Sequence, residues 1–165
     1  MQAFEIGDFR LVTGLYQGLL KIAILYRVGI VGGDVHAAPQ TVITLSLYGA
    51  VEAEAPLTRA AACPGDTIAL TGPLGAAAGG LRLLRDGIKL RPEIGSYLRE
   101  AHLHPQPRIK EGQLLLRCGV KAAIDISDGL LADLGHLCQA SKVGARVTLE
   151  QVPIDPRAGE VPPVM

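Results

Sequence analysis

Stretches with helical spacing of apolar residues alternate along this chain with short runs of apolar and β-branched residues. Between Phe9 and Tyr26 apolar residues recur every three or four positions, which predicts an amphipathic helix, and Gly29 follows as a stop signal. Further helices are predicted over residues 75–85, 92–103, 107–118 and 128–140. Buried strands are predicted over residues 28–31, 41–51, 67–71, 120–126 and 145–149. This alternation predicts an α+β (mixed α/β) fold that ends in a proline-bearing tail without regular structure.

Leucines are expected to form the buried faces of two of these helices. In the helix over residues 75–85 they are Leu81, Leu83 and Leu84. In the helix over residues 128–140 the inward residues are expected to be Leu130, Leu131, Leu134, Leu137 and Cys138. Three glycines of the earlier helix are expected to let it pack closely against a neighbour: Gly75, Gly79 and Gly80.

Composition and charge exclude several classes of protein. Hydrophobic residues make up 48% of the 165 residues, too many for a disordered chain. Sixteen basic residues balance sixteen acidic ones, so no net field attracts nucleic acid or an anionic membrane. Charged residues precede the first apolar run, which argues against a secretory signal, and Lys21 and Arg27 interrupt any membrane-spanning helix. We therefore expect a cytoplasmic protein that binds neither nucleic acid nor membranes.

Three cysteines are far apart in the sequence: Cys63, Cys118 and Cys138. Because no Cys-x-x-Cys pair occurs, neither a disulfide framework nor a zinc site is indicated, and buried reduced thiols are expected. A polar, proline-marked stretch over residues 52–56 follows the second predicted strand. It predicts a domain boundary, with residues 1–54 in one domain and residues 55–165 in the next.

Carboxylates stand at the ends of two predicted strands. Asp34 follows an apolar run and two glycines, which let a ligand approach the backbone closely. Asp125 and Asp128 flank Ser127 where a strand gives way to a helix, beside N–H groups that a helix leaves unpaired. Three carboxylates without a histidine or cysteine offer only hard oxygen ligands, which suit Mg²⁺. The pattern thus indicates a site for magnesium and a phosphorylated substrate.

Simpler interpretations of the same residues remain open. Ser127 or Asp128 could serve only to cap the following helix, although capping does not explain Asp125 at an apolar strand end. A Gly-Gly-Asp sequence is also common in turns. The glycine turn over residues 71–75 lacks the Gly-Lys-Ser/Thr of a P-loop, and His102-x-His104 lacks the partner ligands of a metal site. Nucleotide binding therefore receives no support from the common motifs.

Five motifs occur here in a characteristic order and spacing: Val31-Gly32-Gly33-Asp34, Pro64-Gly65-Asp66, Thr71-Gly72-Pro73-Leu74-Gly75, His104-Pro105-Gln106-Pro107-Arg108 and Asp125-Ile126-Ser127-Asp128-Gly129-Leu130. Together they resemble the thiamine-monophosphate kinase family, a branch of the aminoimidazole ribonucleotide synthetase-like ATP-binding superfamily. The last motif separates these kinases from their relatives. The resemblance implies a two-domain architecture, with part of an N-terminal sheet domain in residues 1–54 and part of a C-terminal α/β domain in residues 55–165.

The resemblance also implies roles for individual residues. The magnesium ligands would be Asp34, Asp125 and Asp128, and the residues that contact ATP would be Tyr16, Gly33, Asp34, Arg59 and Ser127. The implied reaction transfers the γ-phosphoryl group of ATP to thiamine monophosphate and needs no protein nucleophile. Relatives pair strands across a two-fold axis, so a homodimer through residues 41–51 is expected. Val35 and Pro73 depart from the family pattern.

The resemblance covers nearly the whole chain but only the middle of a complete family member. Two alternatives to the kinase therefore remain. The chain could be a non-catalytic remnant or dimerisation module of that fold. It could also belong to a related ATP-dependent enzyme that acts on another small metabolite, because a fold does not determine its substrate.

Overall fold

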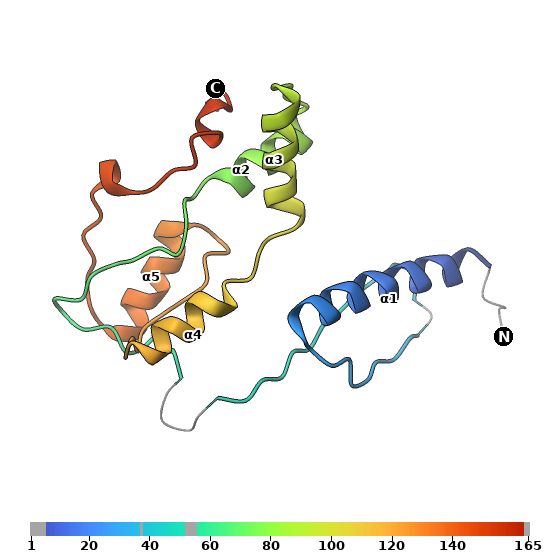
Figure 1. The fold of residues 1–165 in the computed structure, drawn as a ribbon, viewed down its shortest axis with the longest axis horizontal. Coiled ribbons are helices and arrows are strands. Elements are labelled where there is room, and N and C mark those ends of the chain that lie inside the picture. The colour runs from blue at the N-terminus through green and yellow to red at the C-terminus, as the bar shows by residue number, and fades with distance from the viewer. Residues whose placement is uncertain (1–5, 37, 52–55, 164–165) are drawn as a thin grey trace. The chain divides into compact units, whose positions relative to one another are not determined.

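The computed structural model describes residues 6–36, 38–51 and 56–163, and Figure 1 shows its ribbon. The chain divides into two compact units, Met1–Tyr48 and Gly49–Met165. The domain boundary predicted between residues 54 and 55 lies outside the described residues and stays a prediction.

The first unit contains one long helix, α1 (Ile6–Tyr26), which confirms the helix predicted from Phe9 to Tyr26. The helix ends at Tyr26, as predicted, but the residue that stops it differs from the prediction. Arg27, and not Gly29, adopts a left-handed backbone with φ 56°, and the N–H of Val28 donates to the carbonyl of Ala23 at 2.8 Å. Half-buried residues at steps of three or four form a stripe along the helix: Val12, Leu15, Leu19, Ala23 and Tyr26.

The predicted strands are not observed as a sheet. Within the described residues, β-pairing consists of two isolated parallel bridges, Thr58 with Ala122 and Leu74 with Ile154. β-branched residues favour an extended backbone, but a strand also needs a hydrogen-bonded partner. The N-terminal sheet domain is therefore not confirmed, and the regular structure in the described part of the chain is helical.

The second unit contains four α-helices and two short 3₁₀ helices among its described residues. The α-helices confirm the four that were predicted, with ends shifted by two residues or fewer. None of the helices within the described ranges is both long and apolar enough to cross a membrane. The bounds are α2 (Ala76–Asp86), α3 (Pro92–Leu103), α4 (Ile109–Arg117), α5 (Leu130–Ser141), η1 (Leu149–Gln151) and η2 (Ala158–Glu160).

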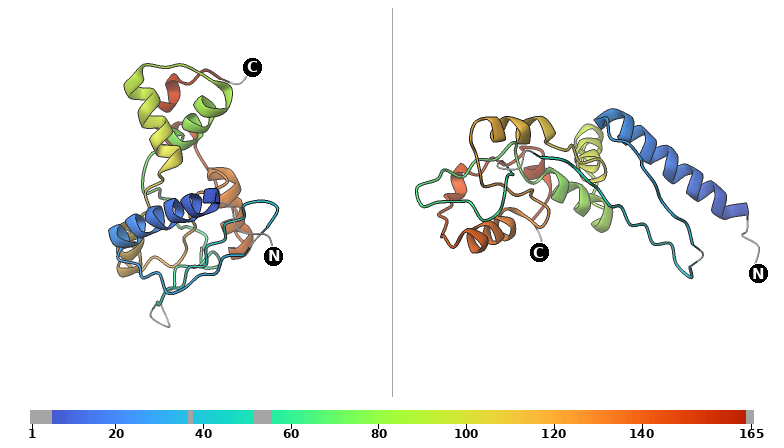
Figure 2. Two further views of the ribbon diagram at one scale, coloured as in Figure 1. Left: turned by 90° about the vertical axis from the view of Figure 1, so that its right-hand side faces the viewer. Right: turned by 90° about the horizontal axis from the view of Figure 1, so that it is seen from below.

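The core of the second unit lies between α2 and α3, which run side by side in both views of Figure 2. Its buried apolar side chains are Leu83, Ile94 and Leu98. A Cβ atom added to Gly80 would lie 2.0 Å from the carbonyl oxygen of Leu98, so the two helix backbones approach very closely there. This contact confirms the packing role predicted for Gly80, whereas Gly75 lies just before α2 as its N-cap residue.

Two leucines of α2 contradict the predicted buried face. Leu81 is 44% exposed and Leu84 is 47% exposed, whereas Leu83 is buried. The reason is that α2 packs mainly against α3, so only one narrow stripe of its surface is covered.

The C-terminal segment is not the irregular tail that its prolines suggested. Its backbone pairs with Leu74, which donates to the carbonyl of Pro153 at 2.8 Å and accepts from the N–H of Asp155 at 2.9 Å. Asp155 is 1% exposed, and its carboxylate accepts hydrogen bonds from the Tyr97 hydroxyl at 2.7 Å and from Nε of Arg157 at 2.9 Å. The C-terminal segment is therefore fastened to α3 through Tyr97 and to the segment before α2 through Leu74.

The three cysteines are free, as expected, but the prediction that they are buried is wrong. Cys63 and Cys118 are exposed and Cys138 is half-buried. Cys63 precedes a turn and Cys118 directly follows α4, and both places face solvent.

Candidate functional site

Three of the predicted site residues lie in the first unit: Tyr16, Gly33 and Asp34. The hydroxyl of Tyr16, on α1, lies close to the backbone of Gly33, because a Cβ atom added to that glycine would be 3.1 Å from the hydroxyl oxygen. The structure thus brings together two residues that the resemblance assigns to ATP. The missing side chain at position 33 leaves room for the tyrosine.

Asp34 presents an exposed carboxylate with two local contacts. Its side chain is 78% exposed, Oδ1 accepts from the N–H of Val35 at 2.8 Å, and Oδ2 lies 2.9 Å from Nε2 of His36. An exposed carboxylate of this kind can ligate a hard cation. His36 was not selected from the sequence, and a cation at Asp34 would compete with it for Oδ2.

In the second unit, the parallel bridge between Thr58 and Ala122 sets Arg59 beside the segment that leads to Asp125. Two backbone hydrogen bonds of 2.8 and 3.1 Å hold the bridge. Because the two segments run in the same direction, one continues into Arg59 while the other continues into the acidic turn. Arg59 and Asp125 are both exposed. Arg59 and the acidic turn therefore both follow this bridge, each on one of the two segments that it joins.

Ser141, the last residue of α5, also holds the Arg59 segment. Its hydroxyl donates to the carbonyl of Arg59 at 2.7 Å and accepts from the N–H of Ala62 at 3.0 Å. The backbone of Arg59 is therefore fixed although its side chain is exposed. One helix thus touches both predicted nucleotide-binding segments of this unit, the Arg59 segment at its C-terminus and the acidic turn at its N-terminus.

Asp133, in the first turn of α5, was not selected from the sequence. It is 3% exposed, and its Oδ2 accepts hydrogen bonds of 3.0 Å from the backbone N–H groups of Ser127, Asp128 and Gly129. The expectation that N–H groups at this turn are unpaired and can bind phosphate is therefore wrong for these three. The available signal was an acidic residue in the first helical turn, where the helix dipole favours negative charge.

Neither Ser127 nor Asp128 caps α5. The N-cap residue is Gly129, with φ 117°, and no side-chain hydrogen bond caps the helix. The capping interpretation of these two residues is therefore wrong. Their side chains, like that of Asp125, are exposed at the turn.

Asp128, Asp133 and His136 each offer one ligand atom, and these atoms lie within 4.8 Å of one another. Asp128 and His136 are exposed, whereas Asp133 is buried. His136 was also missed in the sequence, where its only signal is that it stands three residues after Asp133 on one helix face. Magnesium prefers oxygen ligands, so the carboxylates of Asp125 and Asp128 fit it better than the imidazole does.

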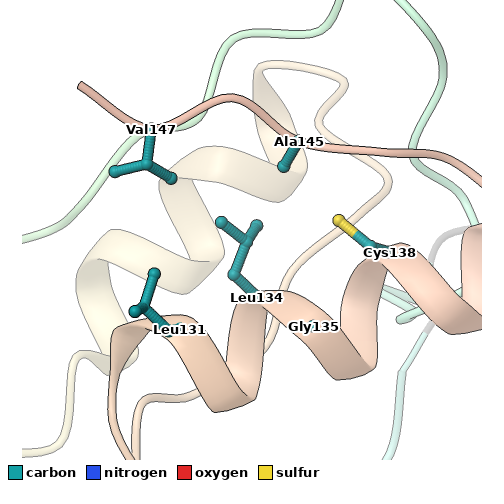
Figure 3. A pocket seen from close by; sticks show the side chains of 6 residues that line it. All are labelled: Leu131, Leu134, Gly135, Cys138, Ala145 and Val147. Atoms are coloured by element: carbon teal, nitrogen blue, oxygen red, sulfur yellow. The ribbon is translucent and has the colours of Figure 1, made fainter.

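An apolar pocket of about 380 Å³ lies along α5, with no charged residue in its lining. Figure 3 shows the side chains of α5 that face Ala145 and Val147 across it. Leu131 lines this open pocket and is 69% exposed, so the prediction that it faces inward is wrong. An apolar lining of this kind does not suit a phosphate group.

Residues 63–162 match the family described as AIR synthase related protein, C-terminal domain. The chain belongs to this family. The matched residues lie within residues 55–165, which were predicted to be part of the C-terminal domain of this fold.

Similar curated proteins are named thiamine-monophosphate kinases. The one from Buchnera aphidicola subsp. Schizaphis graminum is 45% identical over 139 residues, which cover 84% of this chain and 42% of the relative. The one from Escherichia coli is 42% identical over 136 residues, which cover 82% of this chain and 41% of the relative. This chain therefore spans about two fifths of the length of these relatives. The predicted resemblance to thiamine-monophosphate kinases is confirmed.

A solved structure of a thiamine-monophosphate kinase is also similar to this chain. The crystal structure of thiamine-monophosphate kinase from Stenotrophomonas maltophilia is 40% identical to this chain and superposes with a TM-score of 0.58. The superposition covers 63% of this chain and 34% of that one.

Proposed function

We propose that this chain provides part of a thiamine-monophosphate kinase, which transfers the γ-phosphoryl group of ATP to thiamine monophosphate in a magnesium-dependent reaction. The observation that carries the proposal is the identity of 42 to 45% to relatives of that name over more than four fifths of the chain. The exposed carboxylates of Asp125 and Asp128 and the exposed Arg59 support it with the charges that such a reaction needs.

The proposed roles follow from the chemistry of each side chain. Asp34, Asp125 and Asp128 would hold Mg²⁺, which supplies the positive charge that lets carboxylates and polyphosphate lie close together. Arg59 offers a charged donor to phosphate oxygens. The remaining proposed contacts with ATP are those of Tyr16, Gly33, Asp34 and Ser127.

The transfer itself needs no protein nucleophile. An oxygen of the thiamine monophosphate phosphate group forms a bond to the γ-phosphorus of ATP. The bond from that phosphorus to the β–γ bridging oxygen breaks, and ADP leaves with the electron pair. The residues of this chain therefore contribute by positioning and by charge, and none is proposed as a catalytic residue.

Replacing Asp128 with asparagine is expected to lower the rate of thiamine diphosphate formation by about 10- to 100-fold, because the amide keeps the shape but loses the charge. The measurement is turnover of thiamine monophosphate by the purified protein with ATP and MgCl₂. Glu150→Gln is the matched control, because it removes an exposed carboxylate outside the acidic turn. Its rate should equal that of the wild type.

If the wild type turns over thiamine monophosphate, an equal rate in Asp128→Asn would refute the magnesium role of this residue. A wild-type protein without any turnover would instead favour a non-catalytic module of the same fold. The short coverage of the relatives gives that second candidate its support. Calorimetric titration with ATP and Mg²⁺ separates the two candidates further, since an inert module releases no heat of binding.

We also propose a homodimer through residues 41–51. This segment is assigned neither helix nor strand, and its apolar side chains are strongly exposed, with Val42 at 78%, Leu47 at 83% and Tyr48 at 91%. Pairing with a second copy would bury these side chains and complete their backbone hydrogen bonds. Light scattering at micromolar concentration should give twice the monomer mass, and a purely monomeric protein would contradict the proposal.

A further inference from the structure

The acidic turn before α5 is held by a buried carboxylate that no predicted role uses. Oδ2 of Asp133 accepts three backbone hydrogen bonds, all of 3.0 Å, from consecutive residues of the turn, Ser127 to Gly129. Asp133 is 3% exposed, so water does not compete strongly for these bonds. Hydrogen bonds from N–H groups to a charged carboxylate are stronger than those between neutral groups.

These bonds determine which way the turn faces. Because three consecutive N–H groups point inward to one oxygen, the local backbone has little freedom to rotate. The side chains of Asp125, Ser127 and Asp128 are left exposed on the turn. The turn therefore presents carboxylates to solvent, and its inward N–H groups are already paired.

We propose that Asp133 is a positioning residue that fixes the acidic turn so that Asp125 and Asp128 can ligate a divalent cation. This inference rests on the magnesium role assigned to these two residues above. It adds that the N–H groups of Ser127 to Gly129 are not available to phosphate, because Asp133 occupies them.

The alternative role for Asp133 is direct ligation, since one ligand atom of Asp133 lies within 4.8 Å of ligand atoms on Asp128 and His136. Direct ligation through Oδ2 would have to compete with the three hydrogen bonds that this oxygen already accepts. Its burial also restricts access by a hydrated ion. Positioning therefore explains the contacts of Asp133 better than ligation does, and His136 distinguishes the two roles experimentally.

Amide hydrogen exchange tests the geometric part of the proposal without any ligand. In the wild type the amides of Ser127, Asp128 and Gly129 should be protected. In Asp133→Ala their exchange should accelerate by about tenfold or more, because the acceptor is lost. Asp133→Asn keeps an acceptor oxygen and should restore part of the protection. Unchanged exchange in Asp133→Ala would overturn the proposal.

Binding of Mn²⁺ alone, monitored by its electron paramagnetic resonance signal, tests whether Asp133 supports cation binding. We expect Asp133→Ala to weaken Mn²⁺ binding by about tenfold and Asp133→Asn to weaken it less. Asp155→Asn is the matched control, since it removes another buried carboxylate that accepts a backbone N–H but lies outside the turn. Its Mn²⁺ affinity should equal that of the wild type, whatever its effect on thermal stability.

Two results separate failure of this proposal from failure of the proposed function. A wild type that binds Mn²⁺ together with an Asp133→Ala variant of equal affinity overturns the positioning role and leaves the magnesium site intact. A wild type that binds no Mn²⁺ overturns the magnesium role itself. Direct ligation predicts a third result. If His136→Gln weakens Mn²⁺ binding as much as Asp133→Ala does, and the turn amides of Asp133→Ala stay protected, Asp133 acts as a ligand and the positioning role is wrong.

Discussion

Replacing Gly80 with alanine is expected to destabilise the second unit by about 3 kcal/mol, because the added methyl group has no space. Its position would lie 2.0 Å from the carbonyl oxygen and 2.7 Å from the carbonyl carbon of Leu98, and 2.9 Å from Cβ of His102. Two of these three atoms are backbone atoms of α3, which a rotamer change cannot move. The helices α2 and α3 must therefore separate, and the contacts of Leu83 with Ile94 and Leu98 weaken with them.

The measurement is the urea concentration at the midpoint of unfolding, with unfolding monitored by circular dichroism. Gly112→Ala is the matched control, because it adds the same methyl group within α4, where nothing lies within 4 Å of the new atom. That variant should gain about 0.5–1 kcal/mol from the higher helix propensity of alanine. If Gly80→Ala unfolds at the same urea concentration as the wild type, α2 and α3 do not approach this closely in solution.

The helices were predictable because their signal is local. Apolar residues three and four positions apart mark α1, and Pro92 marks the first residue of α3. Strand pairing depends instead on a distant partner. Residues 41–51 show the composition of a strand, yet nothing in that composition specifies the segment with which they pair.

The same distinction applies to the candidate site. Asp125 and Asp128 could be selected from the sequence because two carboxylates flank one serine between an apolar run and a helix, and capping alone does not explain Asp125. Asp133 gave only a general signal, its place in the first helical turn, because its role depends on three N–H groups whose direction follows from the turn conformation. The role of Ser141 could not be predicted from the sequence either, since it contacts Arg59 across 82 positions of sequence. The residues proposed to bind ligands could thus be selected from the sequence, whereas the residues that hold their backbone in place could not.

The C-terminal segment shows how a few polar contacts can order a stretch that composition describes as irregular. Pro153 and Pro156 exclude a regular helix or central strand there. The order comes from Asp155, whose two carboxylate oxygens bind the Tyr97 hydroxyl and the Arg157 side chain, and from the Arg157 guanidinium, which lies 3.2 Å from the centre of the Tyr97 ring. No periodic pattern in the sequence predicts such a cluster.

Stability at acidic pH should depend strongly on this cluster. Hydrogen bonds from Arg157, and then from Tyr97, lower the pKa of Asp155 from the ordinary 3.8 to about 2. A carboxyl group whose pKa is lower in the folded state stabilises the fold above its unfolded pKa, and that contribution is lost as the pH falls toward the folded pKa. The wild type should therefore lose about 2 kcal/mol of stability from this group between pH 5 and pH 2.

Asp155→Asn should remove this acid dependence. The asparagine keeps the size of the side chain but carries no charge for Arg157, and it should lower stability at pH 7 by about 2 kcal/mol. Urea midpoints measured from pH 7 to pH 2 give both quantities, with Asp66→Asn as a control on an exposed carboxylate that accepts only from the nearby N–H of Cys63. The difference in midpoint between wild type and Asp155→Asn should shrink as the pH approaches 2. A difference that stays constant with pH would show that the charge of Asp155 does not hold the segment, and that packing of Val161 against the core does so instead.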